Sequence, residues 1–394
     1  MIVGTAPETY PGERRVAITP ASAGSMVQAG HDVLVAKGSG ALAGFRDEDY
    51  LMRGASLAEN REALFAEADA VLQVRGAGAN AGEGSKDLPL IRPGQVMVGF
   101  HDPLSAPSMA TQVAERGALL FAMELIPRIT KAQSMDALSS MATVEGYKAV
   151  LLAAERLPKM FPLMMTAAGT LSPARVFVIG AGVAGLQAIA TARKLGATVQ
   201  AYDLRPTVKE QVESLGARFV ELPLESNGAE GENGYARAMD EAFYRRQREL
   251  MARVVRESDV VITTAAIPGK KAPLLLTSEM VAAMRPGSVV VDLAAERGGN
   301  CEPTRPGETV ELSDVSLLGP VNLAATVPLH ASQMYAKNVS ALLMHLKEAS
   351  VPPAHDEPLN PNLEDEITRG TLVTAGGRVV HPAVREAMGL SGSS

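Results

Sequence analysis

One stretch decides the fold of this chain: ARVFVIGAGVAGLQAIATARKLGATVQAYD, residues 174–203. It opens with the apolar, mostly β-branched residues 176–179, a pattern typical of a buried strand. A glycine turn with the spacing G-x-G-x-x-G follows, and residues 181–195 can sustain a helix. A second strand is predicted over residues 198–202. This order of strand, glycine turn, helix and strand predicts a dinucleotide-binding half-domain.

Each glycine has a separate role in such a turn. Gly180 permits the tight turn, Gly182 lets a diphosphate approach bare backbone, and Gly185 lets the helix pack closely on the strand. The diphosphate then accepts hydrogen bonds from the N–H groups at the positive end of the helix. The alternative, a purely structural glycine turn, does not explain why strand, helix, second strand and a terminal acid all agree.

Asp203 follows the second strand, where a carboxylate can accept hydrogen bonds from both hydroxyls of an adenosine ribose. Its negative charge would repel a 2′-phosphate, so the sequence favours NAD(H) over NADP(H). Arg205 lies two residues further on and could counter this preference by attracting a phosphate. We expect NAD(H) as the cofactor, with Arg205 as the residue that argues against it.

The composition indicates a soluble globular protein. The 394 residues are enough for two or three domains. A net charge of −7 provides no basic surface for nucleic acid, and the single cysteine cannot form an internal disulfide. The sequence begins without an apolar signal core, and the apolar residues 147–169 are interrupted by charges and prolines. We therefore expect a cytosolic protein without membrane spans, and we find no spacing typical of metal ligands.

Strands and helices alternate over the first 125 or so residues, which predicts a first doubly wound domain with a parallel sheet. The expected elements lie at residues 2–6, 20–29, 31–36, 67–74, 95–100, 109–116 and 118–124. Gly38, Gly40 and Gly44 follow a strand, but no clear helix begins there, so this domain is expected to lack a phosphate-binding turn. The small and polar residues 76–86 are interpreted as a flexible surface loop.

Two long helices, predicted over residues 134–157 and 332–347, are expected to join this domain to a second one. The strands of the second sheet are expected near residues 176, 198, 218, 259, 288 and 315. Residues 371–384 are predicted to return as a β-hairpin and to complete the first domain. The fold class is therefore α/β, with two doubly wound, Rossmann-like domains and a cleft between them. The expected domains are residues 1–139 with 331–394, and residues 140–330.

Ligands of such sheets bind at the carboxyl ends of the strands, and residues 127–136 are expected to lie there, facing the cleft. The polar side chains of this segment and the helix after it are Arg128, Gln133, Asp136 and Ser139. The alternative, favoured by spacing alone, is a helix cap with Ser134 as the N-cap residue and Asp136 in the first turn. At this point the sequence leaves both interpretations open.

Four further features are candidates for a role in the site. Residues 265–267 are small or apolar enough to pack on a flat nicotinamide ring. The acidic, glycine-rich residues 221–235 are either irregular or a lid over the nucleotide, and Tyr235 favours the lid. Cys301 has no histidine nearby in sequence, so a packed thiol is expected. His101 is either a general acid or a helix cap, and capping is favoured.

Five segments resemble the NAD(H)-binding domain I, or alpha subunit, of the proton-translocating NAD(P) transhydrogenases. They are ETYPGERRVAITP, PRITKAQSMDALSS, GAGVAGLQAIATARKLGA, ITTAAIPGKKAP and VDLAAERGGNC. The resemblance covers residues 5–382, nearly the whole chain. Alanine dehydrogenase shares this fold and is also similar at RRVAITP and at the glycine turn.

These two relatives need different chemistry. Resemblance to alanine dehydrogenase places a substrate-binding arginine at Arg15, a lysine at Arg75, a histidine at His101 and a catalytic aspartate at Glu296. The first and third agree, whereas Arg75 and Glu296 depart from the pattern. Hydride transfer between two nicotinamides needs aligned rings and no general base, so the departures weaken only the dehydrogenase. We expect a transhydrogenase, with a stand-alone NAD-dependent alanine dehydrogenase as the alternative.

The resemblance also implies which residues bind the nucleotide. Arg128, Gln133 and Asp136 would be the catalytic group. The residues Arg128, Ile129, Gln133, Asp136 and Ser139 would hold the nicotinamide, its ribose and the facing subunit. The other implied contacts are Gly180, Gly182, Val183, Gly185, Asp203, Leu204, Arg205, Gly234, Tyr235 and Ala266. Residues 228–235 would form a mobile loop that closes over bound NAD(H).

Finally, the resemblance implies an assembly. The chain would be the split-form alpha subunit, a homodimer held at the cytoplasmic face of the inner membrane by its partners. Those partners would be membrane-spanning subunits and a subunit that binds NADP(H). Hydride would pass between NAD(H) on this chain and NADP(H) on the partner, coupled elsewhere to proton translocation.

Overall fold

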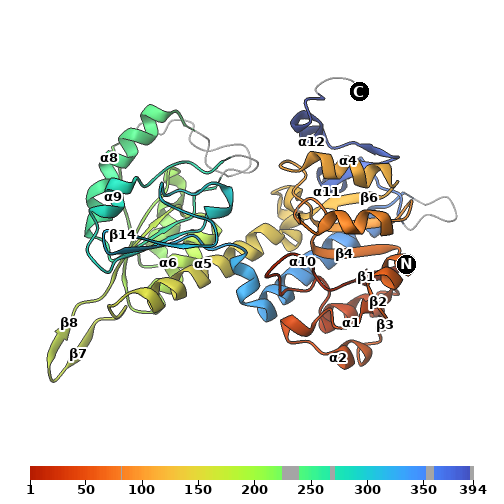
Figure 1. The fold of residues 1–394 in the computed structure, drawn as a ribbon, viewed down its shortest axis with the longest axis horizontal. Helices are drawn as coiled ribbons and strands as arrows, with labels where there is room; N and C mark the ends of the chain where they lie inside the picture. The colour runs from red at the N-terminus through yellow and green to blue at the C-terminus, as the bar shows by residue number, and fades with distance from the viewer. Residues whose placement is uncertain (81, 224–238, 267–270, 352–358, 391–394) are drawn as a thin grey trace. The chain divides into compact units, whose positions relative to one another are not determined.

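The computed structural model describes residues 1–80, 82–223, 239–266, 271–351 and 359–390. The chain forms two compact units, the first from Met1–Met141 with Ala325–Ser394 and the second from Ala142–Ala324. Each unit has a mostly parallel sheet with helices packed on it (Figure 1). This architecture confirms the predicted α/β fold class.

The first unit contains an eight-stranded sheet. Its strands lie in the order β17 (Arg378–Val379), β16 (Leu372–Ala375), β6 (Leu119–Ala122), β5 (Val96–Phe100), β4 (Ala70–Arg75), β1 (Ile2–Thr5), β2 (Asp32–Ala36) and β3 (Ser56–Ala58). Neighbouring strands from β6 to β3 are parallel, and β16 is antiparallel to both of its neighbours. The edge strand β3 was not expected, because its three residues are too few to show an alternating pattern.

Helices cover both faces of this sheet. They are α1 (Pro20–Gln28), α2 (Asp47–Leu51), α3 (Arg61–Glu67), α4 (Pro107–Glu115), α10 (Pro328–Ala349), α11 (Glu366–Thr371) and α12 (Pro382–Ala387). On one face, Val71 and Met97 of the central strands pack with Leu64 of α3 and Val113 of α4. Helices α1 and α10 contact each other, and α10 also contacts β5. Short 3-10 turns occur at η1 (Ala41–Ala43), η2 (Gly84–Leu90), η3 (Met123–Leu125) and η4 (Thr130–Met135).

The C-terminal hairpin forms as predicted. Strands β16 and β17 are joined through Gly376 and Gly377, whose φ values of 56° and 73° suit glycine at the two central turn positions. The hairpin extends the sheet at β6, where the Thr374 hydroxyl donates to the carbonyl of Ala118 and accepts from the N–H of Leu120. A late segment of the sequence therefore completes the first sheet.

The interpretation of residues 76–86 as a flexible surface loop is wrong for residues 76–80, which are buried or half-buried, whereas Gly82, Ser85 and Lys86 lie at the surface. Ala77 and Asn80 are buried, and the Asn80 amide donates to the Thr9 hydroxyl. A Cβ atom on Gly78 would lie 1.9 Å from the carbonyl oxygen of His101. The small residues are thus used for close packing, which composition alone does not distinguish from flexibility.

The second unit contains a seven-stranded sheet. Its strands lie in the order β11 (Arg218–Phe219), β10 (Thr198–Tyr202), β9 (Arg175–Ile179), β12 (Val260–Thr263), β13 (Val289–Asp292), β15 (Val315–Leu318) and β14 (Thr309–Leu312). All pairs except β14 with β15 are parallel. The six expected strands form, and the strand order reverses between β9 and β12, which is where such sheets bind their ligands.

Side chains of β9 alternate between two cores. Val176 and Val178 pack with helices α5 (Ala137–Arg156), α6 (Val183–Lys194) and α7 (Lys209–Ser214). Phe177 and Ile179 pack with α8 (Glu241–Glu257) and α9 (Ser278–Ala282). Figure 1 shows these two groups of helices on opposite sides of the sheet. The remaining turns are η5 (Pro206–Val208), η6 (Ala295–Arg297) and η7 (Leu323–Thr326).

The long helices differ slightly from their predicted bounds. Helix α5 begins at Ala137, later than expected, because the preceding residues form η4. Helix α10 begins at Pro328, earlier than expected, with the proline in its first turn. No helix among the described residues is both long enough and apolar enough to cross a membrane.

A hairpin that the sequence did not reveal follows α5. Strands β7 (Met164–Thr166) and β8 (Gly169–Leu171) pair only with each other and project from the second unit (Figure 1). All six strand residues are exposed, and the side chain of Met165 is 80% exposed. An isolated two-stranded hairpin buries little surface, so its apolar side chains remain available for contacts.

Candidate functional site

The glycine turn lies between β9 and α6. Gly180 has a φ of 99°, which favours glycine. A Cβ atom on Gly180 would lie 2.5 Å from the Thr264 hydroxyl, and one on Gly185 would lie 1.8 Å from the carbonyl oxygen of Gly180. Both positions therefore require glycine, because the chain itself fills the space that a side chain would take.

Gly182 differs from its two neighbours in the motif. It is the N-cap residue of α6, and no atom of the described residues lies within 4 Å of a Cβ built on it. Its side-chain direction is thus open space beside the first N–H groups of a helix. An anionic group can approach the backbone here, which is the geometry that a diphosphate needs.

Asp203 connects the glycine turn to the second strand. Its carboxylate accepts from the N–H of Ala181 at 2.7 Å and from the N–H of Arg205 at 2.8 Å. The Arg205 side chain donates to both carboxylate oxygens, each at 3.0 Å. Since a carboxylate offers about four lone-pair positions, a ribose can bind it only by replacing one or more of these contacts. The residue that argues against NAD(H) in the sequence is therefore an ion-pair partner of Asp203.

The loops after β12 and β13 lie at the same edge of this sheet. Thr264 donates from its hydroxyl to the carbonyl oxygen of Gly180 at 3.0 Å, and Ala266 is exposed. Glu296 is also exposed, in η6. Cys301 is 2% exposed within the apolar core, and burial raises the pKa of its thiol. As expected, the cysteine is a packed thiol and not an activated nucleophile.

The segment before α5 belongs to the first unit. Arg128 and Gln133 are exposed, with Gln133 in η4. Asp136 precedes α5, and its carboxylate accepts from the N–H of Ser139 at 2.9 Å and from the hydroxyl of Ser139 at 2.5 Å. Asp136 therefore caps the helix, and the expectation that Ser134 is the N-cap residue is wrong. The structure thus confirms a helix cap, formed by Asp136 with Ser139, and a role of these two residues in the site stays a prediction.

His101 does not cap a helix, contrary to expectation. Its side chain is 3% exposed, and neither ring nitrogen has a hydrogen-bond partner within the described residues. Burial lowers the pKa of His101 to about 3, so the ring is neutral at physiological pH. The absence of a partner on either ring nitrogen among the described residues argues against capping, and a ring with this pKa is not the imidazolium that a general acid would start from at neutral pH.

A buried ionic cluster near His101 was only partly visible in the sequence. Arg15 binds Glu13 through two hydrogen bonds, at 2.7 and 2.6 Å. The guanidinium of Arg75 lies 4.2 Å from the centre of the Tyr10 ring. Glu8 accepts from the N–H groups of Val74 and Arg75, and burial raises its pKa to about 7. Both arginines could be picked out in the sequence, whereas their acidic neighbours Glu8 and Glu13 could not, although Glu13 lies two residues from Arg15.

Some residues predicted for the site lie outside the part of the chain that the structure describes. Gly234 and Tyr235, with the rest of the proposed closing loop from residue 228, lie outside the described residues. The same holds for Ile267. Across the described ranges, no group of three or more His, Cys, Asp and Glu side chains is arranged to hold a metal ion.

An open glycine turn at the switch point of a doubly wound sheet defines a nucleotide-binding α/β protein. The family models for the alanine dehydrogenase/PNT N-terminal and C-terminal domains match residues 4–145 and 149–382. The chain therefore belongs to the alanine dehydrogenase/PNT family, as the sequence predicted.

Within this family the chain is more similar to transhydrogenases than to alanine dehydrogenases. It is 43% identical over 379 residues to the first of the chains that form NAD(P) transhydrogenase subunit alpha in Rhodospirillum rubrum, covering 96% of this chain and 97% of that protein. It is 42% identical to the crystal structure of a transhydrogenase from Sinorhizobium meliloti, with a TM-score of 0.85, covering 96% of this chain and 100% of that one. The alanine dehydrogenase of Mycobacterium tuberculosis is 29% identical over 335 residues, covering 83% of this chain and 82% of that protein.

Proposed function

We propose that this chain is the NAD(H)-binding alpha subunit of a proton-translocating NAD(P) transhydrogenase, exchanging hydride with NADP(H) on a partner subunit. The observation that carries the proposal is the near-complete match to transhydrogenase alpha subunits at about 40% identity. The open backbone at Gly182 and the carboxylate of Asp203 support a dinucleotide at this turn.

The proposed NAD(H) contacts divide between the two units. In the second unit they are Gly180, Gly182, Val183, Gly185, Asp203, Leu204, Arg205 and Ala266, with Gly234 and Tyr235 on the closing loop. In the first unit they are Arg128, Ile129, Gln133, Asp136 and Ser139, which we assign to the nicotinamide half and to the partner subunit. The bound nucleotide supplies the hydride chemistry, and the chain supplies orientation and exclusion of water. Residues 140–330 are the proposed NAD(H)-binding domain.

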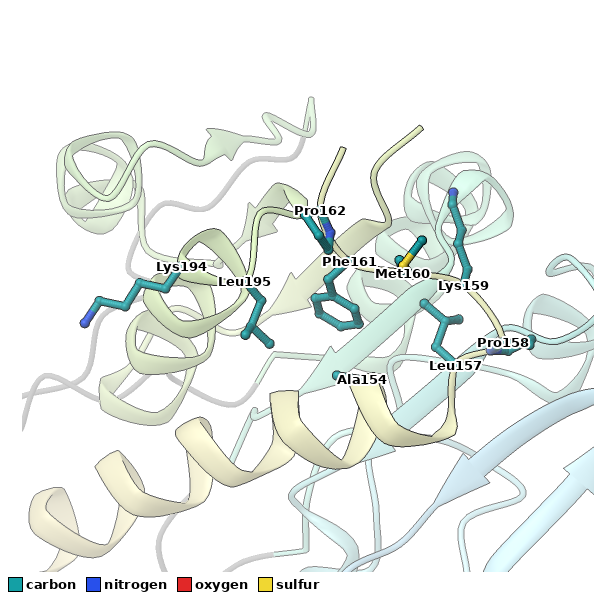
Figure 2. Close-up of a pocket in the computed structure, with 9 residues that line it drawn as sticks. All are labelled: Ala154, Leu157, Pro158, Lys159, Met160, Phe161, Pro162, Lys194 and Leu195. Carbon is teal, nitrogen blue, oxygen red and sulfur yellow. The ribbon is translucent and has the colours of Figure 1, made fainter. Parts of the chain in front are cut away.

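The proposal also includes the assembly. We assign a homodimer, membrane-spanning partners and a place at the cytoplasmic face of the inner membrane. The exposed hairpin β7–β8 supports a contact with a second copy, because it presents the exposed apolar side chains of Met164, Met165 and Leu171 on unpaired strand edges. A hollow of about 730 Å³ in the second unit is lined by apolar side chains such as Leu157 and Phe161 and by the lysines Lys159 and Lys194. Figure 2 shows these side chains. Hairpin and hollow are adjacent in sequence through residues 158–163.

The proposal is tested by hydride transfer, followed through nicotinamide absorbance. One cuvette holds the purified chain with NADH, pyruvate and ammonium. The other holds the chain with NADH, an NADP analogue and the NADP(H)-binding subunit. Turnover only in the second cuvette is the expected result, whereas turnover in the first identifies a stand-alone alanine dehydrogenase and overturns the proposal.

The role of Gln133 gives a sharper test. The variant Gln133→Asn should slow hydride transfer in the reconstituted complex about tenfold or more, because a shortened side chain disturbs ring alignment. NADH affinity should change little, since a positioning contact contributes more to alignment than to binding. Lys131→Ala, a change at another exposed residue of η4, is the matched control. Unchanged turnover of Gln133→Asn would remove Gln133 from the catalytic group.

A further inference from the structure

A buried amide joins two loops at the carboxyl edge of the second sheet. Asn300 is 0% exposed and lies in the loop after β13. Its side-chain oxygen accepts from the N–H of Ala265 at 3.0 Å, and its side-chain nitrogen donates to the carbonyl oxygens of Ala265 and Pro273, each at 2.9 Å. One side chain thus holds both backbone polar groups of Ala265, which fixes the two peptide planes that flank this residue.

Asn300 is itself firmly anchored. Asp292, the last residue of β13, is 0% exposed and accepts from the N–H groups of Asn300 and Cys301 at 2.8 and 3.1 Å. The same carboxylate accepts from the hydroxyls of Thr304 at 2.6 Å and Thr263 at 3.0 Å. A fully bonded buried carboxylate stabilises one arrangement of its loop, so the Asn300 amide is presented from a rigid base.

The loop that Asn300 holds is also bonded to the glycine turn. Thr264, next to Ala265, donates from its hydroxyl to the carbonyl oxygen of Gly180. The loops after β9, β12 and β13 are therefore linked by hydrogen bonds from Thr264 to Gly180, from Ala265 to Asn300 and from Asn300 to Asp292, with the peptide bond between Thr264 and Ala265 joining the first to the second. This series runs along the edge at the switch point of the sheet.

We infer that Asn300 is a positioning residue for hydride transfer, holding the peptide of Ala265 and Ala266 at a fixed place relative to the glycine turn. The inference rests on the proposed function, in which Ala266 contacts NAD(H), and on the prediction from the sequence that residues 265–267 pack on the nicotinamide ring. A packing role alone would be served by an apolar side chain, which avoids the cost of burying an amide. Hydride transfer is sensitive to displacements of about 1 Å, so a rigid loop under the ring has a direct effect on rate.

The variant Asn300→Ala removes all three side-chain hydrogen bonds and leaves Asn300 backbone contacts in place. We expect the rate of hydride transfer in the reconstituted complex to fall about tenfold or more. The dissociation constant for NADH, measured by fluorescence titration, should rise by less than about threefold, because the glycine turn and Asp203 remain. This split between rate and affinity is the signature of positioning.

Loss of stability alone must be separated from positioning. Val255→Ala is the matched control, because Val255 is 0% exposed in the last turn of α8, which leads into the start of β12 at the opposite edge of the sheet. Removing two carbon atoms there should lower the free energy of unfolding by about 2 kcal/mol without affecting hydride transfer. If Asn300→Ala does not fold, Asn300→Ser replaces it with the same expectation, since its hydroxyl is too short to reach both loops.

The outcomes distinguish the inference from the proposed function. Equal hydride-transfer rates for the Asn300 variant and Val255→Ala, in a complex where the unaltered chain is active, would overturn the positioning role and leave the transhydrogenase assignment intact. An unaltered chain that transfers no hydride with its partner would overturn the proposed function itself. A slow Asn300 variant beside a fast Val255 variant supports both.

Discussion

The two sheets each contain a strand followed by Gly-Ala-Gly, and the two turns serve different purposes. In the second unit, residues 176–182 read VFVIGAG, and a Cβ on Gly182 would meet no atom of the described residues within 4 Å. In the first unit, residues 72–78 read LQVRGAG, and a Cβ on Gly78 would lie 1.9 Å from the carbonyl oxygen of His101. One turn leaves space for a ligand, and the other is filled by the protein.

The element that follows each turn explains the difference. Helix α6 begins at Val183, directly after the second glycine, so its first N–H groups point into the open space. After Gly78 no helix begins among the described residues until the 3-10 turn η2 at Gly84, and of the residues between them Asn80 is buried whereas Gly82 is exposed. Glycine spacing indicates a phosphate site only when a helix begins at the turn.

The largest change in stability is expected for a substitution in the packed turn of the first unit. Gly78→Ala should lower the free energy of unfolding by about 3 kcal/mol, because a backbone carbonyl occupies the place of the new methyl group. Gly82→Ala is the matched control in the same loop, since no atom of the described residues lies within 4 Å of its Cβ. Denaturant unfolding measures both variants. Equal stability of the two would show that the loop of the first unit is as loose as its composition suggested.

A smaller effect concerns the histidine that packs on this turn. The pKa of His101 is about 3 in the folded chain and about 6.5 when unfolded, so below pH 6.5 the unfolded state binds the additional proton. This group therefore stabilises the fold above pH 6.5 and loses that contribution as pH falls towards 3, by about 1.4 kcal/mol for each pH unit. His101→Leu should remove this slope between pH 6.5 and 5.

The measurement is the free energy of unfolding as a function of pH, taken as the difference between His101→Leu and the unaltered chain. Glu8 and Glu124, whose pKa values burial raises to about 7, act in the opposite direction, because the folded chain then binds protons between pH 7 and 4.5. Both acids are present in the two proteins, so they cancel in the difference. Parallel pH profiles would contradict the burial of a neutral His101.

The smallest change in stability is expected for a substitution in the open turn of the second unit. Gly182→Ala should leave the free energy of unfolding within about 0.5 kcal/mol, because its φ of −75° and its open surroundings accept a methyl group. NADH affinity should fall about tenfold, since the methyl group enters the space of the diphosphate. Titration by nicotinamide fluorescence measures it. Unchanged affinity would separate this turn from nucleotide binding.

Much of the fold could be predicted because its signals are local. The strand at residues 176–179, the glycine turn and the helix after it are adjacent in sequence, and so are the glycines of the C-terminal hairpin. Short or edge elements such as β3 and β14 were missed, because each has too few residues to establish a period. The hairpin β7–β8 was also missed, because its strands have three residues each and lie in a stretch interrupted by prolines.

The site was less predictable, because its contacts join distant residues. Nothing near Asn300 in sequence indicates that its amide binds Ala265, and the burial of His101 depends on a glycine loop more than twenty residues earlier. The ion pair of Arg205 with Asp203 was within reach of sequence reasoning, since only Leu204 separates them. Tertiary packing determines contacts between distant residues, and a single sequence gives no direct signal of which distant residues meet.

The strand that contains Thr374 has a consequence for biosynthesis. Its hydroxyl bonds to Ala118 and Leu120, more than 250 residues earlier, so the first sheet lacks its antiparallel edge until this strand has left the ribosome. The second unit, in contrast, is one continuous range, Ala142–Ala324. Nascent domains fold as units once their residues are available. We therefore expect the second unit to fold first during translation, because the sheet of the first unit is completed only by a segment synthesised near the end.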